Sequence, residues 1–276
     1  MNRIDFAFLD SGTGGVPYML ALKQKNPDAR CVFLGDTIHF PYGEKSAQEV
    51  TDCASEAIKK IIENWNPRTI VVACNTISVT SLETLRSAFP SIPIVGTVPA
   101  IKLAAKVSKN KRIGLLATNA TVNHPYSKKL AEDFASDCVV VNRGDPDLVS
   151  FIEHDFFTAT LEEKKAAIKP AVDFFKKNDC DTIILGCTHF THIADVCKLV
   201  AGDGISVIDS RDGVSNQALR VESDFVHSEK NADEPSKKIT LPEDCTFFVT
   251  AATKEEESEY QKLCKNCGIP WGGVLK

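Results

Sequence analysis

The chain has 276 residues, of which 43% are hydrophobic and 25% are charged, and its formal net charge at pH 7 is -5. This balance is typical of a folded globular protein and argues against long disordered regions. No stretch gathers enough Lys and Arg to neutralise a nucleic-acid backbone, so we expect no nucleic-acid partner. The length predicts two compact domains or one large α/β unit.

The N-terminal residues do not have the pattern of a secretion signal, because Asp5 and Asp10 interrupt the apolar run. No apolar window approaches the ~20 residues that cross a bilayer. The sequence therefore predicts a cytoplasmic protein with no membrane segment. Its ten cysteines should stay reduced there, and most are expected to be small core residues. These structural thiols are Cys31, Cys53, Cys138, Cys180, Cys197 and Cys245.

Short runs rich in Val, Ile, Leu and Phe alternate along the chain with longer amphipathic stretches. The runs predict strands over 4–10, 31–36, 69–74, 92–97, 112–118, 138–142, 182–187, 205–210 and 246–253. The stretches predict helices over 46–65, 78–89, 99–109, 123–136, 161–177, 190–201 and 254–266. Continuous apolar strands separated by helices indicate parallel sheets covered on both faces, so the fold class is α/β.

Two features interrupt this alternation. Pro170 lies inside the 161–177 pattern and predicts a kink or a break there. The polar, charged segment 228–238 has the composition of a linker or an exposed loop.

A weak internal repeat relates the two halves of the chain. In the first half, Asp10 ends one strand and Cys74 ends a later one; in the second half, Thr118 and Cys187 have the matching places. Ligands bind outside the carboxyl ends of parallel strands, so both cysteines are expected where chemistry occurs. We expect a helix to begin after each cysteine, with N-terminal amides that favour a thiolate.

Two thiols in matching positions suit a reaction that removes a proton from one face of a carbon and returns one to the other. One thiolate would act as the base and one thiol as the acid. Asp10 and Glu153 could orient a thiol or bind a substrate ammonium group. His189 could assist Cys187 in the same way, and a packed core histidine is the equal alternative.

Three further motifs bear on ligand binding. The loop Ser11–Gly15 lacks the next glycine of a dinucleotide fingerprint, because Pro17 stands there, so it is expected to approach a small carboxylate instead. Residues 40–43 have the composition of an ordinary surface turn. Cys264 and Cys267 have the spacing of half a zinc site, but no second pair completes it, so no metal is expected.

With these residues assembled, the sequence resembles members of the aspartate/glutamate racemase superfamily. The resemblance rests on seven motifs in family order: FLDSGTGG (8–15), GDTIHFPYG (35–43), VVACNT (71–76), PIVGTVPAIK (93–102), GLLATNAT (114–121), FIEHD (151–155) and ILGCTH (184–189). It implies two pseudo-symmetric α/β domains with the active site in the cleft between them. The first would comprise 1–97 and 211–276, and the second 98–210.

The resemblance also implies an activity, which is the reversible interconversion of L- and D-glutamate without pyridoxal phosphate, metal or other cofactor. The product D-glutamate would supply peptidoglycan synthesis and thus cell-wall biogenesis and cell shape. The implied catalytic residues are Cys74 and Cys187, assisted by Asp10, Glu153 and His189. The implied substrate-binding residues are Asp10, Ser11, Tyr42, Gly43, Asn75, Thr76, Thr118, Thr121, Thr188 and His189.

The chain departs from the family at His154 and Asp155, where many relatives have small residues after the glutamate, and His154 changes the charge next to Glu153. The C-terminal segment WGGV (271–274) is assigned to none of these motifs.

Several alternatives stay open. An aspartate racemase or a maleate- or hydantoin-type relative would use the same scaffold. A hydrolase built on Cys187 and His189 would leave Cys74 unexplained, and a non-catalytic protein could close on an acidic amino acid. The oligomeric state is not fixed by the sequence, and a homodimer is one option.

Overall fold

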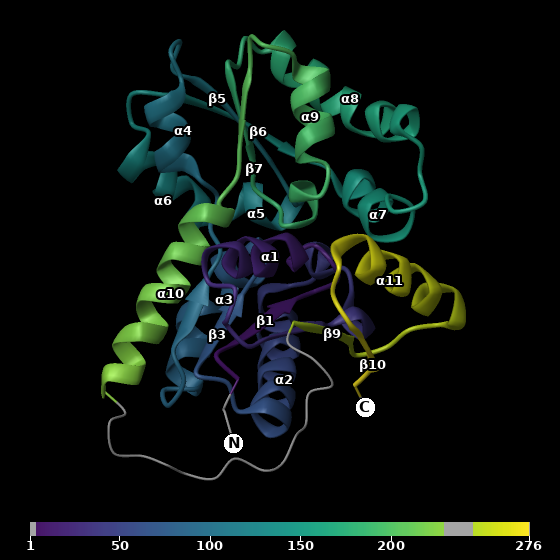
Figure 1. Ribbon diagram of the computed structural model, residues 1–276. Helices are drawn as coiled ribbons and strands as arrows, with labels where there is room; N and C mark the ends of the chain where they lie inside the picture. The colour runs from purple at the N-terminus through teal and green to yellow at the C-terminus, as the bar shows by residue number, and fades with distance from the viewer. Residues whose placement is uncertain (1–3, 229–244, 276) are drawn as a thin grey trace. The chain divides into compact units, whose positions relative to one another are not determined.

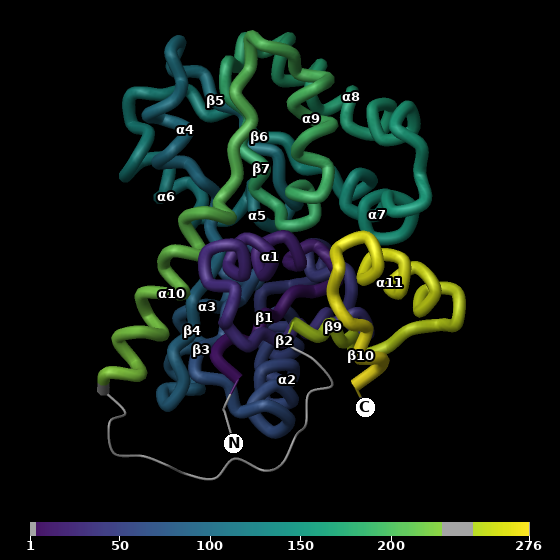
Figure 2. Tube along the Cα trace, viewed as in Figure 1, coloured from purple at the N-terminus to yellow at the C-terminus, as the bar shows by residue number. Residues whose placement is uncertain are grey.

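The computed structural model describes residues 4–228 and 245–275. The predicted linker over 228–238 lies outside these residues, except for Ser228, which ends helix α10 (Arg211–Ser228). The chain divides into two compact units, one of residues 1–42, 46–97 and 211–276 and the other of residues 43–45 and 98–210. Figures 1 and 2 show the elements of each, and we describe the units separately.

The first unit is built on a six-stranded sheet in the order β10-β9-β2-β1-β3-β4. Every neighbouring pair in this sheet is parallel. Its strands are β1 (Phe6–Asp10), β2 (Cys31–Gly35), β3 (Thr69–Val72), β4 (Ile94–Gly96), β9 (Thr246–Val249) and β10 (Trp271–Val274). The residues of β1, β2 and β3 are all buried, as their continuous apolar sequences predict for strands covered on both faces.

Helices cover both faces of this sheet (Figure 1). They are α1 (Val16–Lys25), α2 (Ala47–Trp65), α3 (Asn75–Ala88), α10 and α11 (Lys254–Cys267). Two short 3-10 helices, η1 (Thr37–His39) and η2 (Tyr42–Glu44), lie between β2 and α2 in the chain. Helix α2 begins at a capping box between Ser46 and Glu49, and it ends where Asn66 adopts a left-handed conformation. Its apolar stripe, which includes Ile58 and Ile61, packs into the core beside β1 and β3.

The second unit is built on a four-stranded sheet in the order β6-β5-β7-β8, again with every pair parallel. The strands are β5 (Arg112–Ala117), β6 (Val139–Gly144), β7 (Thr182–Leu185) and β8 (Ser206–Ile208). The helices are α4 (Ile101–Val107), α5 (Asn119–Asn123), α6 (Pro125–Phe134), α7 (Pro146–His154), α8 (Leu161–Lys177) and α9 (Ala194–Ala201), with the 3-10 helix η3 (His189–Thr191). The predicted α/β class with mainly parallel sheets is confirmed.

The same strand order occurs in both units. In chain order within each unit, the second strand lies on one side of the first, the third lies on the other side, and the fourth follows the third: β2-β1-β3-β4 and β6-β5-β7-β8. The sequence repeat that links Cys74 to Cys187 therefore reflects a repeated sheet topology, and β3 corresponds to β7.

Several local expectations were wrong. Pro170 does not break α8, which continues from Leu161 to Lys177 after a capping box at its start. The helix expected over 123–136 is α6, which begins later, at Pro125, because His124 caps it; the short α5 before it was not predicted. Helices α1, α7 and α10 and strand β10 were not predicted, and β10 contains the unassigned WGGV motif. Across the part of the chain that the structure describes, every helix is too short or too polar to cross a membrane.

Candidate functional site

The carboxyl edge of the first unit's sheet carries Cys74. Strand β3 ends at Val72, and the chain continues through Ala73 to Cys74, which occupies the N-cap position of the 14-residue helix α3. The Cys74 side chain is buried, with 4% of the residue exposed. The prediction that a helix begins directly after this cysteine is confirmed, so the first-turn amides of α3 lie next to the thiol's residue.

Asp10 ends the neighbouring strand β1 at the same edge. Its carboxylate is fully buried and accepts a 2.8 Å hydrogen bond from the backbone N–H of Gly15. A methyl group added to Gly15 would lie 2.7 Å from Cβ of Ala73, so the 11–15 loop packs closely against the residue before Cys74. The fold thus brings this loop and Cys74 together, and the predicted substrate residues Ser11, Asn75 and Thr76 are all buried there.

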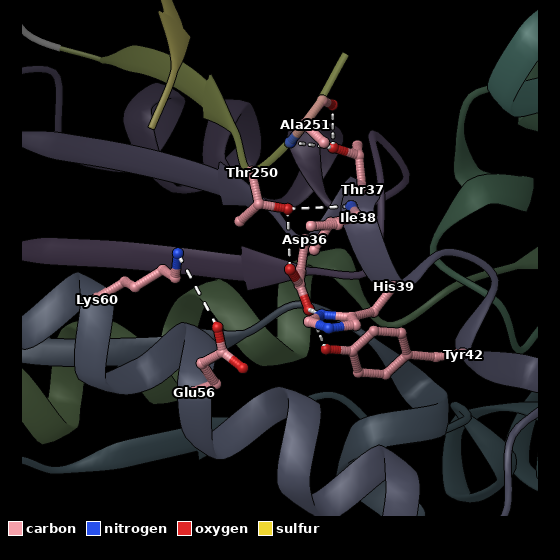
Figure 3. A network of polar contacts seen from close by, with 9 residues as sticks. All are labelled: Asp36, Thr37, Ile38, His39, Tyr42, Glu56, Lys60, Thr250 and Ala251. Carbon is pink, nitrogen blue, oxygen red and sulfur yellow. Dashed lines mark hydrogen bonds and ion pairs between the residues drawn. The ribbon is translucent and has the colours of Figure 1, made fainter. Parts of the chain in front are cut away.

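Tyr42 is buried, with 1% exposed, so the expectation of an ordinary surface turn at residues 40–43 was wrong. Its hydroxyl donates to the buried carboxylate of Asp36 (Figure 3). Asp36 also bonds to His39 Nδ1 at 2.8 Å and accepts from Thr250 Oγ1 at 2.9 Å. Burial and the adjacent Asp36 carboxylate raise the pKa of Tyr42 well above its ordinary value. Tyr42 is therefore held as a neutral hydrogen-bond donor.

The same network joins η1 to the chain after β9. The hydroxyl of Thr250 accepts from the N–H of Ile38 at 3.1 Å, and the N–H of Ala251 donates to Thr37 Oγ1 at 3.0 Å (Figure 3). Sequence reasoning missed Asp36 and Thr250. An aspartate at the end of the predicted 31–36 strand was the available signal, because acidic residues at strand ends are often functional.

In the second unit, Cys187 follows β7, which ends at Leu185. The prediction that an α-helix begins directly after this cysteine was wrong, because the segment forms a 3-10 helix. Bonds from Phe190 N–H to the Cys187 carbonyl at 3.1 Å and from Thr191 N–H to the Thr188 carbonyl at 3.0 Å close the 3-10 helix η3. An α-helix begins only at Ala194. Cys187 therefore lacks the α-helical N-terminus that Cys74 has.

Cys187 has an imidazole beside it instead. Its Sγ lies 3.8 Å from Nδ1 of His189, and Nε2 of His189 lies 2.8 Å from Oε2 of Glu153 on α7. The side chains of this histidine and glutamate are 2% and 1% exposed. The structure thus joins three predicted catalytic residues, Cys187, His189 and Glu153, into one buried chain.

The charge of His189 follows from these contacts. Burial opposes protonation of its imidazole, but the hydrogen bonds to Cys187 and Glu153 outweigh burial and raise its pKa well above the ordinary value. A protonated imidazole in this position places positive charge beside the sulfur of Cys187. Of the two sequence interpretations of His189, the geometry therefore favours assistance to Cys187 over simple packing.

The remaining predicted binding residues lie at the ends of β5 and β7. Thr118 caps α5, and its hydroxyl donates to Thr121 Oγ1 at 3.0 Å. A methyl group added to Gly43 would lie 3.0 Å from Cβ of Thr118, so the Gly43 backbone approaches this threonine closely. Thr188 is buried beside Cys187. Because β5 pairs with β7, these residues share one edge of the sheet.

The cysteines of the half zinc motif belong to α11. Cys264 is buried, and burial raises its pKa to about 12. Within residues 4–228 and 245–275, no group of three or more His, Cys, Asp or Glu side chains is arranged to hold a metal ion.

Each unit therefore carries a buried thiol at the carboxyl edge of a parallel sheet, with an acidic or imidazole group at the same edge. A fold of this class with two such thiols is that of an amino-acid racemase, and the chain belongs to the Asp/Glu/Hydantoin racemase family, whose model matches residues 19–216. The predicted family membership is confirmed.

Relatives that cover almost the whole chain are glutamate racemases. The chain is 34% identical over 275 residues to glutamate racemase of Treponema pallidum (strain Nichols), covering 99% of this chain and 97% of the relative. It is 37% identical over 266 residues to glutamate racemase of Glaesserella parasuis serovar 5 (strain SH0165), covering 96% of this chain and 95% of the relative. The fold is similar to that of Escherichia coli glutamate racemase in complex with L-glutamate and the activator UDP-MurNAc-ala, with a TM-score of 0.84, 27% identity, and coverage of 99% and 98%.

Proposed function

We propose that this chain is a glutamate racemase that interconverts L- and D-glutamate. The observation that carries the proposal is the pair of buried thiols, Cys74 and Cys187, each after the third strand of an equivalent sheet. The near full-length similarity to glutamate racemases supports glutamate as the substrate. We also propose that the chain has two domains, the first of residues 1–97 and 211–276 and the second of residues 98–210.

The reaction needs two proton transfers at Cα. In one direction, the thiolate of one cysteine takes the α-proton, so the C–H bond breaks, an S–H bond forms, and the electron pair stays on carbon as a carbanion. The thiol of the other cysteine then donates its proton to the opposite face and becomes a thiolate. The next turnover in the same direction requires that the two protonation states be restored by proton exchange with solvent.

The neighbouring groups would make each thiol a competent base. Asp10 lies on the strand beside the one that leads to Cys74, and it would accept or orient the proton on that side. The His189 imidazolium, held by Glu153, would stabilise the Cys187 thiolate. Both roles are electrostatic and gain strength from burial.

The substrate carboxylates need donors, and the described site residues offer them. Asn75 and Thr76 form the first turn of α3, where backbone N–H groups and the helix dipole favour the α-carboxylate. The other proposed binding residues are Asp10, Ser11, Tyr42, Gly43, Thr118, Thr121, Thr188 and His189. We further propose a cytoplasmic enzyme whose D-glutamate serves peptidoglycan synthesis, as the family resemblance implies.

A circular-dichroism assay with purified protein and each glutamate enantiomer tests the activity. In heavy water, the product enantiomer should carry solvent deuterium at Cα in both directions. Cys74→Ser and Cys187→Ser should each abolish racemisation, whereas Cys138→Ser, a partly exposed thiol before β6, should keep wild-type rates. Full activity of either of the first two variants would falsify the two-thiol mechanism.

Assays of aspartate racemisation, of hydrolysis and of glutamate binding separate the alternatives. Preferred turnover of aspartate would assign the chain to an aspartate racemase of the same family. Thioester or amide cleavage that survives Cys74→Ser and is lost with Cys187→Ser would favour a hydrolase. Binding of glutamate without any exchange at Cα would favour a binding protein.

A further inference from the structure

In the second unit, His189 lies in the short turn 187–192, and Glu153 lies in the last turn of α7, which runs on into the turn 155–159. Each of the two turns is closed by its own hydrogen bonds. The turn 187–192 includes a bond from His192 N–H to the His189 carbonyl at 3.1 Å, in addition to those that form η3. The turn 155–159 continues from α7, with Phe156 N–H bonded to the Phe151 carbonyl at 2.9 Å and Ala159 N–H bonded to the Asp155 carbonyl at 2.9 Å. His189 and Glu153 are therefore attached to locally rigid segments.

These segments meet a second time, through aromatic rings. The ring of Phe157 lies edge-on to the imidazole of His192, with centroids 5.2 Å apart and an interplanar angle of 89°. Phe156 contacts Phe157 edge-on at 5.3 Å and lies 6.2 Å from His192. Lys164 on α8 places its Nζ 4.3 Å from the centroid of the Phe156 ring. We call Phe156, Phe157 and His192 the aromatic cluster.

The aromatic contact matters because a single hydrogen bond restrains the distance between two segments more strongly than the angle between them. The 2.8 Å bond between His189 and Glu153 restrains one point of the turn 187–192, and the orientation of the turn bears on the 3.8 Å separation between Cys187 Sγ and His189 Nδ1. An edge-on ring pair prefers a defined angle as well as a defined distance. The contacts Glu153–His189 and Phe157–His192 therefore hold the turn 187–192 at two points, which restrains its orientation as well as its distance from α7.

We propose that Phe157, through its contact with His192, is a positioning residue that holds His189 at its working distance from Cys187. It touches none of the reacting atoms and acts through the turn that carries them. The proposal deepens the racemase function and rests on it, since Cys187 must act as an acid and a base for the positioning to affect turnover.

Phe157→Leu tests this role, because it keeps an apolar side chain and removes the ring edge. We expect kcat to fall about tenfold in both directions while KM stays within about twofold, since the contact should act on proton transfer rather than on binding. The primary isotope effect of α-deuterated substrate should rise in the direction in which Cys187 removes the proton and fall in the other. Phe157→Tyr, which keeps the ring, should restore wild-type behaviour.

Phe134→Leu is the matched control. Phe134 lies on α6 of the same unit and also has a lysine near its ring, with Lys102 Nζ 5.1 Å from the centroid, but it is 43% exposed. This variant should behave as the wild type. Equal kinetic effects of Phe157→Leu and Phe134→Leu, or a change confined to KM, would overturn the proposal.

A second readout does not depend on turnover. The buried imidazole N–H of His189 should give a downfield proton resonance, assigned by its loss in His189→Asn. In Phe157→Leu this resonance should shift or broaden, whereas in Phe134→Leu it should not; an unchanged resonance in Phe157→Leu overturns the positioning role. If the wild type fails to racemise glutamate while the resonance responds, the racemase function fails and the positioning stands. If Phe157→Leu does not fold, His192→Ala and His192→Phe replace it, and only the first should disturb the resonance.

Discussion

His189 lies between a thiol and a carboxylate in a position almost closed to water, and these surroundings make its charge part of the folded state. Because its pKa is raised on folding, the folded protein binds a proton more tightly than the unfolded chain does. The resulting stabilisation is fully present below the unfolded pKa of about 6.5 and is lost as the pH rises through the folded pKa.

We therefore predict that His189→Asn flattens the pH dependence of stability. The wild-type free energy of unfolding should decline relative to that of the variant as the pH rises above about 6.5. Urea unfolding at a series of pH values measures the difference between the two proteins. Parallel curves across the alkaline range would show that the imidazole is not held protonated.

Tyr42 supplies a second prediction for a single side chain. Tyr42→Phe removes a donor from the buried Asp36 carboxylate, and it should lower the free energy of unfolding by about 1–3 kcal/mol. Tyr126→Phe is the control, because Tyr126 is 39% exposed and should lose almost no stability. Urea unfolding of both variants decides, and equal stabilities would mean that the Asp36 network contributes little.

At this scale the sequence could identify the two thiols, since each follows a recognisable apolar strand. It could not identify the partners of Asp36. The bond from Thr250 to Asp36 joins residues 214 positions apart, and it depends on the pairing of β2 with β9. Such a pairing is set by the whole sheet, so local patterns carry no signal for it.

Among the elements, η3 is a case in which the predicted and the observed structure differ. Residues 188–192 are Thr, His, Phe, Thr and His, all of modest helix propensity. The α-helix therefore begins only at Ala194. The apolar spacing over 190–201 nevertheless predicted one helix. By contrast, α2 and α8 have capping boxes and long amphipathic patterns, and their predicted bounds differ from the observed ones by one residue at most.

Strand β5 gives a prediction about packing between elements. A methyl group added to Gly114 would lie 2.3 Å from a ring carbon of Phe175, which is fully buried on α8. Gly114→Ala should therefore push α8 from the sheet and cost about 1–3 kcal/mol of stability. Gly204→Ala is the control, because nothing lies within 4 Å of its added methyl group. Thermal unfolding compares the two, and equal melting temperatures would contradict the close packing.

At the scale of the whole molecule, the repeated strand order explains why the sequence repeat was weak but informative. The repeat preserves what each strand end must provide, a thiol after the third strand, while the surrounding residues differ. The α/β class and both parallel sheets could be predicted from periodicity. The strand that became β9 was also predicted, over 246–253, but the edge strand β10 could not be, because WGGV has little of the alternation or bulk that marks a strand.

Independence from cofactors and the homodimer remain predictions for the complete protein. Racemisation should survive exhaustive dialysis against a metal chelator and treatment with hydroxylamine, which removes pyridoxal phosphate. Loss of activity that is restored by a metal ion or by pyridoxal phosphate would contradict the independence from cofactors.

Sedimentation equilibrium tests the homodimer, and a single species of the monomer's 30.1 kDa would exclude a stable dimer.

The assisting groups fall on different strands in the two units: Asp10 ends the first strand of its sheet, whereas His189 follows the third strand of the other. Under the proposed function, the two half-reactions therefore have chemically unlike bases. Yet enantiomers have equal free energies in an achiral solvent, so the Haldane relation requires equal kcat/KM in both directions whatever the protein does. Substitutions can change kcat and KM for each enantiomer, but the ratio kcat/KM must change by the same factor for L- and D-glutamate. A stronger partner for one thiol therefore changes kcat/KM equally in both directions.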